Sequence, residues 1–271
     1  MIQSYFLGAN SATGFQSCYH SFCTEEQDFL YVIKGGPGSG KSTFMKRIGA
    51  TAERRGLDVH YVRCSGDPDS LDGVYMPTLH LGYVDGTAPH VIEPKYPGIS
   101  GCYLDFSKFF DVAGLQSVAS EIRELNKEYK SCYQAAYTCL AAHHAKSAGI
   151  PDGKTRFRHA ITCQGLVTLP APSAPKLVSE SDLIALSECE HGVRYLHPLF
   201  PDRIIGVYDR INDTYWESPL NLPDCSDAVE FLQEAKRLHD NLESLYRPFV
   251  DFSGIDNLLS THKKALSDCA K

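Results

Sequence analysis

Apolar residues in the first part of the chain change between two spacings, which predict strands and helices in turn. A continuous apolar run covers residues 29–33, as in a strand that is buried on both faces of a parallel sheet. Apolar positions within 44–52 then recur at helical spacing, and Gly56 follows as a C-terminal cap. Residues 57–65 and 79–86 are further strand candidates. This order predicts an α/β fold with a mainly parallel sheet.

Two long amphipathic stretches predict helices that pack along each other. Apolar residues recur every three or four positions within 115–140, and again within 229–245. A last helix is expected around 255–266. The proline- and glycine-rich segment 86–114 lies ahead of the first long helix and suits a long functional loop or lid.

The best domain boundary lies at "GIPDG", residues 149–153, which separates a first half (1–150) from a second half (151–271). The two halves share matching stretches in the same order. "DPDSLDGVY" (67–75) resembles "FPDRIIGVY" (200–208), and "ANSATGF" resembles "AITCQGL". We interpret this as an internal duplication. The second half has "PAPSAPKLVSES" where a glycine-rich loop would stand, so it is predicted to be a degenerate copy without a phosphate loop.

The segment "GGPGSGKS", residues 35–42, satisfies the P-loop pattern G-x-x-x-x-G-K-[ST] between a predicted strand and a predicted helix. In such a loop, backbone N–H groups and the positive end of the helix dipole hold phosphates, and the lysine adds a point charge. The alternative is a glycine-rich turn that binds nothing. The predicted nucleotide-binding residues are Gly35, Gly36, Pro37, Gly38, Ser39, Gly40, Lys41, Ser42 and Thr43.

Two carboxylates are candidates for the chemistry beside this loop. Asp85 closes an apolar strand candidate, where a P-loop protein places the carboxylate that helps to hold Mg²⁺ together with the Ser42 hydroxyl. Asp67 follows another strand and is a candidate to orient a water or take a proton. Each has an alternative as an ordinary turn residue. The predicted catalytic residues are thus Lys41, Asp67 and Asp85, and the predicted metal ligands are Ser42 and Asp85.

Composition and charge narrow the class of protein. The net charge of −7 over 271 residues gives no basic footprint for a nucleic-acid partner. No run of about eighteen apolar residues exists and the start lacks the features of a signal peptide, so we expect a cytoplasmic protein that does not enter a membrane. The ten cysteines are scattered without a C-x-x-C pair and are expected to be reduced thiols. No oligomeric state is predicted.

The stretches "FLGANSATGF", "VIKGGPGSGKSTFMKRIG", "CSGDPDSLDGVY" and "VDGTAPHVIEPKYPG" together resemble a little-characterised bacterial family of P-loop ATPase-like proteins with two tandem halves. Typical members keep a phosphate loop in each half, and this chain lacks the second. The resemblance implies a P-loop NTPase three-layer fold. It also implies nucleotide binding by Gly35, Gly40, Lys41, Ser42 and Thr43, and it supplies no substrate.

The leading hypothesis is an ATP-binding P-loop NTPase that uses Mg²⁺, hydrolyses ATP slowly and couples the nucleotide state to a conformational change or a protein partner on its long helices. One alternative is a kinase that transfers the γ-phosphate to a nucleoside or another small molecule. A third interpretation is a nucleotide-dependent switch or scaffold without hydrolysis. Arg156, Arg158 and Arg203 are candidates for an arginine finger from the second half, and no pattern selects among them.

Overall fold

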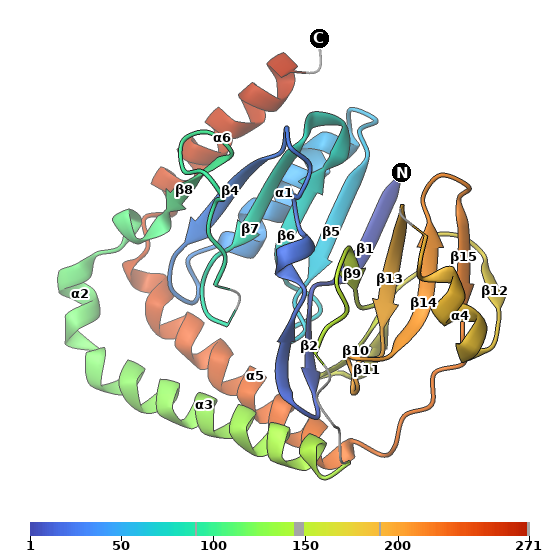
Figure 1. Cartoon of the computed structure of the whole chain (residues 1–271). Helices are drawn as coiled ribbons and strands as arrows, with labels where there is room; N and C mark the ends of the chain where they lie inside the picture. The colour runs from blue at the N-terminus through green and yellow to red at the C-terminus, as the bar shows by residue number, and fades with distance from the viewer. Residues whose placement is uncertain (90, 144–148, 190, 270–271) are drawn as a thin grey trace.

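The protein is a mixed α/β structure with two main sheets, seen in a computed structural model that describes residues 1–89, 91–143, 149–189 and 191–269 (Figure 1). The first half contains β1 (Ile2–Phe6), β2 (Gly8–Ser11), β3 (Gly14–Ser17), β4 (Phe29–Lys34), α1 (Lys41–Glu53), β5 (Val59–Arg63), β6 (Leu71–Met76), β7 (Leu81–Asp85), β8 (Gly101–Asp105), α2 (Val112–Ser117) and α3 (Ala119–Ala141). The second half contains β9 (Thr155–Arg156), β10 (His159–Thr162), β11 (Gly165–Thr168), β12 (Pro175–Leu177), α4 (Glu180–Leu186), β13 (Gly192–Leu196), β14 (Ile204–Asp209), β15 (Thr214–Glu217), α5 (Ser226–Tyr246) and α6 (Phe252–Cys269).

The strands of the first half form a six-stranded sheet in the order β1-β5-β6-β7-β4-β8. Only β6 runs antiparallel to its neighbours, so this sheet is mainly parallel. Three of its strands, β1, β6 and β8, were not predicted. β6 lies largely in the stretch 67–75, which was matched to 200–208 but not assigned to a strand, and β8 lies inside the 86–114 segment, which is therefore not a continuous lid. β8 was missed because it is a short edge strand between glycine and a helical turn.

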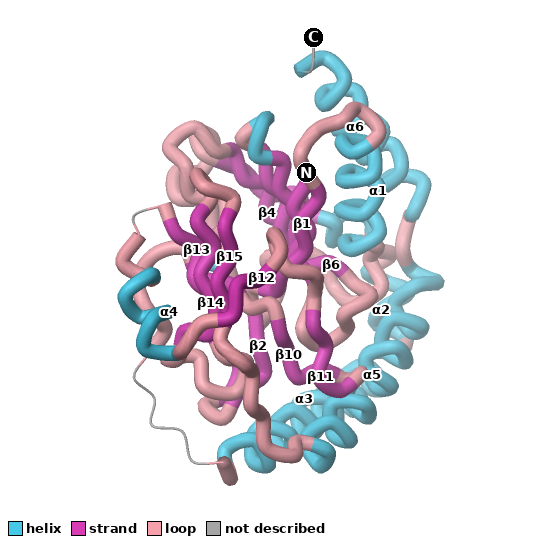
Figure 2. Tube along the Cα trace, turned by 90° about the vertical axis from the view of Figure 1, so that its right-hand side faces the viewer, coloured by secondary structure: helices cyan, strands magenta, loops and turns pink. Residues whose placement is uncertain are grey.

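Helices cover only one face of this sheet, which corrects the three-layer expectation. α1 and α6 lie side by side over one face of the sheet (Figure 2). Phe44 and Ile48 of α1 pack with Ile255 and Leu259 of α6 in one buried cluster. The opposite face belongs to a second cluster, and none of the described residues in that cluster comes from an α-helix. The β2–β3 hairpin and strands of the second half bury this face, so a third helical layer has no surface to cover.

The second sheet has the order β12-β15-β14-β13-β9, which repeats the order β4-β7-β6-β5-β1 of the first sheet. The pair directions also agree, since β12 and β9 are parallel to their neighbours and β14 is antiparallel on both sides. Gly73 pairs with Val84, and Gly206 pairs with Glu217. Strand pairing thus places residues 67–75 and 200–208 in equivalent positions, as the sequence match aligns them.

The two long helices pack against each other in antiparallel directions. Ala136 and Leu140 near the end of α3 share a buried cluster with Ala228 and Leu232 near the start of α5. The stripe predicted from 115 is interrupted at Val118, where α2 ends and α3 begins. The predicted last helix corresponds to α6, which packs on α1 of the first half. Within the described residues, every helix is too short or too polar to cross a bilayer.

Candidate functional site

The segment between β4 and α1 is a tight loop of residues 35–40, named here the glycine loop. β4 lies between β7 and β8 and runs parallel to both, so the loop leaves the carboxyl end of the sheet, where ligands collect in α/β folds. Gly38 and Gly40 have φ values of +67° and +84°, which glycine adopts without steric cost. The Ser39 hydroxyl donates to the carbonyl of Gly36 at 2.8 Å and closes the loop.

Lys41 and Asp85 come together beside this loop. The ammonium of Lys41 donates to the carbonyls of Gly35 at 2.9 Å and Gly36 at 3.0 Å, and its Nζ lies 3.5 Å from Oδ2 of Asp85. Asp85 ends β7 directly opposite Ile33 of β4. Both charged side chains are mostly buried, with 11% and 15% of their surface exposed. The two residues predicted from separate signals therefore form one charged pair at the carboxyl edge of the sheet.

Asp85 also forms the hydrogen bonds of a turn residue, which was the alternative interpretation of this position. Its Oδ1 accepts from the backbone N–H of Thr87 at 2.8 Å and from the Thr87 hydroxyl at 2.6 Å. The other oxygen, Oδ2, faces Lys41, so one oxygen of Asp85 binds the turn and the other pairs with the lysine. The carboxylate is thus held in one orientation at the mouth of the glycine loop.

Ser42 stands in the first turn of α1, as a P-loop requires, and its hydroxyl already has a partner. Its Oγ accepts from the backbone N–H of Leu71 at 3.0 Å, which joins the start of α1 to the start of β6. The oxygen keeps a lone pair for a cation. Thr43 is exposed on the next position of the helix.

Asp67 has the contacts of a turn residue. Its Oδ1 accepts from the N–H of Asp69 at 3.3 Å, and its Oδ2 accepts from the Ser70 hydroxyl at 2.9 Å. Lys236 of α5 lies 3.7 Å from the same Oδ2. These contacts explain Asp67 as a turn residue.

The end of α5 and the start of α6 lie directly on the glycine loop, which the sequence did not predict. A Cβ placed on Gly38 would lie 2.8 Å from the carbonyl oxygen of Glu243, and one on Gly36 would lie 3.0 Å from the ring of Tyr246. Phe252 of α6 lies 3.6 Å from the corresponding position of Gly40. Residues two hundred positions away therefore shape the loop, and no local pattern signals such a contact.

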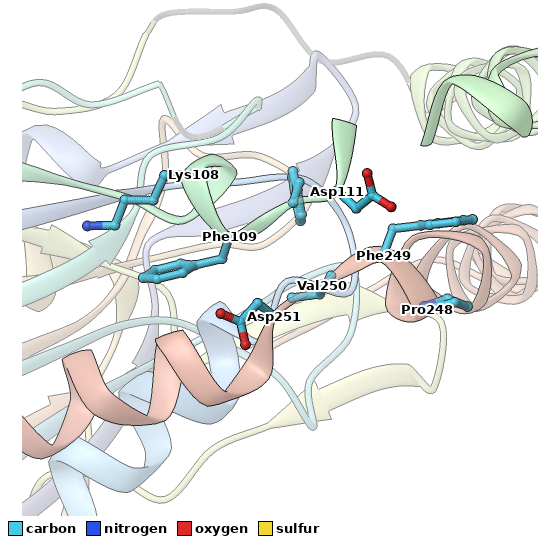
Figure 3. Close-up of a pocket in the computed structure, with 8 residues that line it drawn as sticks. Lys108, Phe109, Asp111, Pro248, Phe249, Val250 and Asp251 are labelled. Atoms are coloured by element: carbon cyan, nitrogen blue, oxygen red, sulfur yellow. The ribbon is translucent and has the colours of Figure 1, made fainter. Parts of the chain in front are cut away.

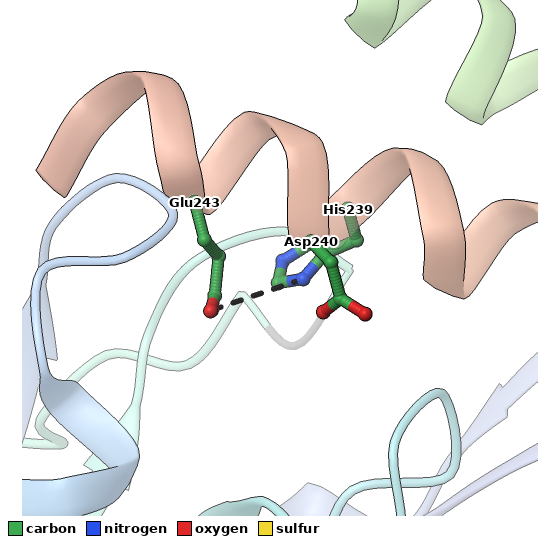
Figure 4. A group of neighbouring side chains, drawn as sticks. All are labelled: His239, Asp240 and Glu243. Atoms are coloured by element: carbon green, nitrogen blue, oxygen red, sulfur yellow. Dashed lines mark ion pairs between the residues drawn. The ribbon is translucent and has the colours of Figure 1, made fainter.

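Three polar side chains project from one side of this part of α5, namely those of His239, Asp240 and Glu243 (Figure 4). Their ligand atoms lie within 4.8 Å of one another, and Nδ1 of His239 is 3.8 Å from a carboxylate oxygen of Glu243. Asp240 and Glu243 are exposed, and Asp240 also pairs with Lys236 at 2.6 Å. Exposed acidic groups of this kind are common without a metal, so we assign no cation to them.

A shallow cavity of about 300 Å³ lies where the segment 108–111 meets the segment 248–251 (Figure 3). Phe110 and Val250 form an antiparallel bridge at its centre. Asp111 accepts from the N–H of Gly114, and Asp251 accepts from that of Gly254. Both carboxylates thus serve as helix caps, which gives this cavity a structural explanation.

The arginine-finger candidates have other partners. Arg158 donates to Glu217 inside the second half, and Arg203 forms an exposed pair with Glu180. Arg156 lies over the ring of Tyr5, 3.7 Å from its centroid. These contacts give no support to an arginine finger.

Comparison of the chain with protein-family models, with curated proteins and with solved structures found no match.

Proposed function

We propose that this protein binds a nucleoside triphosphate, with ATP as the first candidate, together with Mg²⁺ at the glycine loop. The observation that carries the proposal is the meeting of Lys41 and Asp85 at the ends of adjacent parallel strands, beside a loop with glycines at positive φ. Backbone N–H groups of residues 35–43 would hold the phosphates, and Lys41 would exchange its carbonyl partners for phosphate oxygens. Ser42 and Asp85 would hold Mg²⁺ and its water shell.

We infer slow hydrolysis rather than vigorous turnover. Asp67, the candidate for activating the nucleophile, already accepts two turn hydrogen bonds and lies beside Lys236. These contacts are those of a turn residue, so the proposed chemistry depends mainly on electrostatic stabilisation by Lys41 and the cation. For the kinase alternative, a lid over an acceptor would have to come from the residues before β8, because β8 is part of the sheet.

The nucleotide state is proposed to be coupled to the long helices. The end of α5 touches Gly36 and Gly38, and α5 packs along α3, so a shift of the loop on nucleotide binding would move this helical pair. A bistable contact of this kind can carry a signal to a partner. The same contact between α5 and the glycine loop would also serve a nucleotide-dependent switch that does not hydrolyse ATP.

The second half is proposed to be a duplicated copy that has lost its phosphate site. Its strand order repeats that of the first half, yet β12 is joined to α4 by only residues 178 and 179. Such a short connection leaves no loop to surround a phosphate. This supports one nucleotide site in the chain and agrees with the proposed relation to a two-half family of P-loop ATPase-like proteins.

The test is a thermal-unfolding series with ATP or GTP in the presence of Mg²⁺. A nucleotide at a hundred times its Kd should stabilise the native protein by about 2.7 kcal/mol, and Lys41→Ala should lose this stabilisation. Lys46→Ala is the matched control, since Lys46 is an exposed lysine of the same helix. Equal nucleotide shifts in wild type and Lys41→Ala would refute the proposed site.

The metal role of Asp85 is tested by Asp85→Asn. We expect this variant to bind the nucleotide as the wild type does when Mg²⁺ is absent. The increase in nucleotide affinity that Mg²⁺ causes should be at least about tenfold smaller than in the wild type, because one charged group that holds the water shell is removed. Titration calorimetry with and without Mg²⁺ measures the difference, and Asp69→Asn serves as the exposed control. Full Mg²⁺ dependence in Asp85→Asn would assign Asp85 to the turn alone.

A further inference from the structure

A second, larger cavity lies between the two halves, at the opposite edge of the first sheet from the glycine loop. It encloses about 380 Å³ and is lined by the starts of β1 and β5 and the end of β6. Tyr5, His60 and Tyr75 contribute from these strands. The glycine loop leaves the carboxyl ends of the parallel strands, whereas this cavity lies toward their amino ends. The two sites therefore share no residue.

The second half closes the cavity with cationic side chains. Lys154, Arg156 and Arg210 all line it. Lys154 pairs with Glu25, whereas the arginines bond to neutral groups. Arg156 donates to the side-chain oxygen of Gln3 at 3.2 Å, and Arg210 donates to a backbone carbonyl at 3.2 Å. Among the described residues, neither guanidinium forms an ion pair with a carboxylate, so both keep N–H groups and charge for a ligand.

The carboxylates of the cavity wall are already engaged. Asp28 accepts from the hydroxyl of Tyr75 at 2.8 Å and lies 3.1 Å from Nδ1 of His80. Asp58 holds the N-terminal amine, and Glu25 holds Lys154. The side of the cavity that remains available for a new charged partner is therefore the arginine side.

His60 adds a polar group that lacks a partner within the described residues. Its Nδ1 is buried without a hydrogen bond, and its ring makes edge contacts with Tyr5 and Tyr75. Burial first, and then the charge of Arg156, lowers the pKa of His60 to about 3, so the imidazole is neutral and can donate or accept one hydrogen bond. An unpaired buried group costs free energy that a ligand can recover.

We propose that this cavity binds a small organic anion with a planar body. Its anionic group, a carboxylate or a phosphate, would lie between Arg156 and Arg210, since a guanidinium fork matches either oxyanion. Its ring would pack against Tyr75, which lines the cavity and is only partly buried, because Arg156 already lies over the ring of Tyr5. The volume falls in the range of ligand pockets, about 300–1,000 Å³. The same ligand would bridge the two halves of the chain.

The probes are benzoate and phenyl phosphate, with benzamide as a neutral control of similar shape. Binding is measured by titration calorimetry and ligand-observed NMR on the full chain, in a Lys41→Ala background that removes the proposed phosphate site. We expect at least one anion to bind, and benzamide to bind at least about tenfold more weakly, because a charge-assisted hydrogen bond is lost.

Arg156→Ala and Arg210→Ala should each weaken anion binding by about tenfold or more, whereas Arg123→Ala, on the exposed face of α3, should leave it unchanged. Arg210 is exposed, and among the described residues its side chain donates to a backbone carbonyl alone, so its variant tests the site even where Arg156→Ala perturbs folding. The proposal is overturned when neither anion binds at millimolar concentration, when benzamide binds equally well, or when both arginine variants bind like the wild type. Failure here leaves the nucleotide series unaffected.

Discussion

Replacing Gly38 with alanine is expected to abolish the ATP-dependent rise in melting temperature and to lower the free energy of unfolding by about 2–5 kcal/mol. Two separate costs add at this position. The backbone has a φ of +67°, where an L side chain is strained, and the new methyl group would lie 2.8 Å from the carbonyl oxygen of Glu243. Either the glycine loop or the end of α5 must move, and both changes disturb the proposed phosphate site.

Gly56→Ala separates the two costs. Gly56 also has a positive φ, +73°, but a Cβ there would have no atom within 4 Å. This variant should lose only about 1–2 kcal/mol and keep the full nucleotide shift. Chemical denaturation gives the stabilities, and thermal unfolding with ATP and Mg²⁺ gives the ligand effect. Were Gly38→Ala to match Gly56→Ala in both measurements, the contact between α5 and the glycine loop would have no functional meaning.

Arg158→Met is expected to destabilise the protein by about 3–5 kcal/mol at pH 7, because it leaves the buried carboxylate of Glu217 without its cation. Arg158 donates to Glu217 through Nε at 2.9 Å and through Nη2 at 2.5 Å. Tyr215 donates to the same carboxylate at 2.9 Å, and His159 lies 3.4 Å away. Glu217 is only 8% exposed, so water cannot replace the lost partner.

The free energy of unfolding lost in Arg158→Met should become smaller as the pH falls. Burial acts to raise the pKa of Glu217, but the hydrogen bonds from His159, Arg158 and Tyr215 outweigh it and leave the pKa below its ordinary value. A carboxyl with a depressed pKa in the folded state contributes stability above its unfolded pKa of about 4.3, and that contribution disappears as the pH falls through the folded value. The difference between wild type and Arg158→Met should therefore shrink below about pH 4.

Urea unfolding at pH 7 and at acid pH measures this difference. Arg203→Met is the matched control, since Arg203 and Glu180 form a bidentate pair that is 45% and 50% exposed. It should change the free energy of unfolding by less than about 1 kcal/mol. Equal effects of the two substitutions would show that burial does not strengthen the Arg158 pair.

The local signals of the chain predicted a large part of the first half. The strand at 29–33, the helix from 44 and the glycine pattern between them follow from residue spacing and glycine content, and all appear within a few residues of their expected bounds. Asp85 was predicted as the metal-site carboxylate because it closes an apolar strand candidate, and the structure places it 3.5 Å from Lys41. Strand β6 was missed because the Asp-Pro-Asp turn before it extends the polar pattern into the strand.

The second half was harder to predict from spacing. Its long helix appears as expected at α5, whereas the short helix α4, which follows the prolines at 170, 172 and 175, was not predicted. The short strand β12 belongs to the sheet because it pairs with β15, and the register of that pair is set by the tertiary structure. Local propensity alone does not decide such a short element.

Residue order alone therefore specified the strand before the glycine loop, the helix after it, and the groups that this loop can offer a ligand, since glycine, lysine and hydroxyl groups lie next to one another in the sequence. Folding in three dimensions decided the rest. It placed α5 against Gly38, α6 on the first sheet, and Arg156 of the second half over the ring of Tyr5. These contacts join residues more than a hundred positions apart, and they depend on which apolar faces become buried together, which no spacing along the chain records.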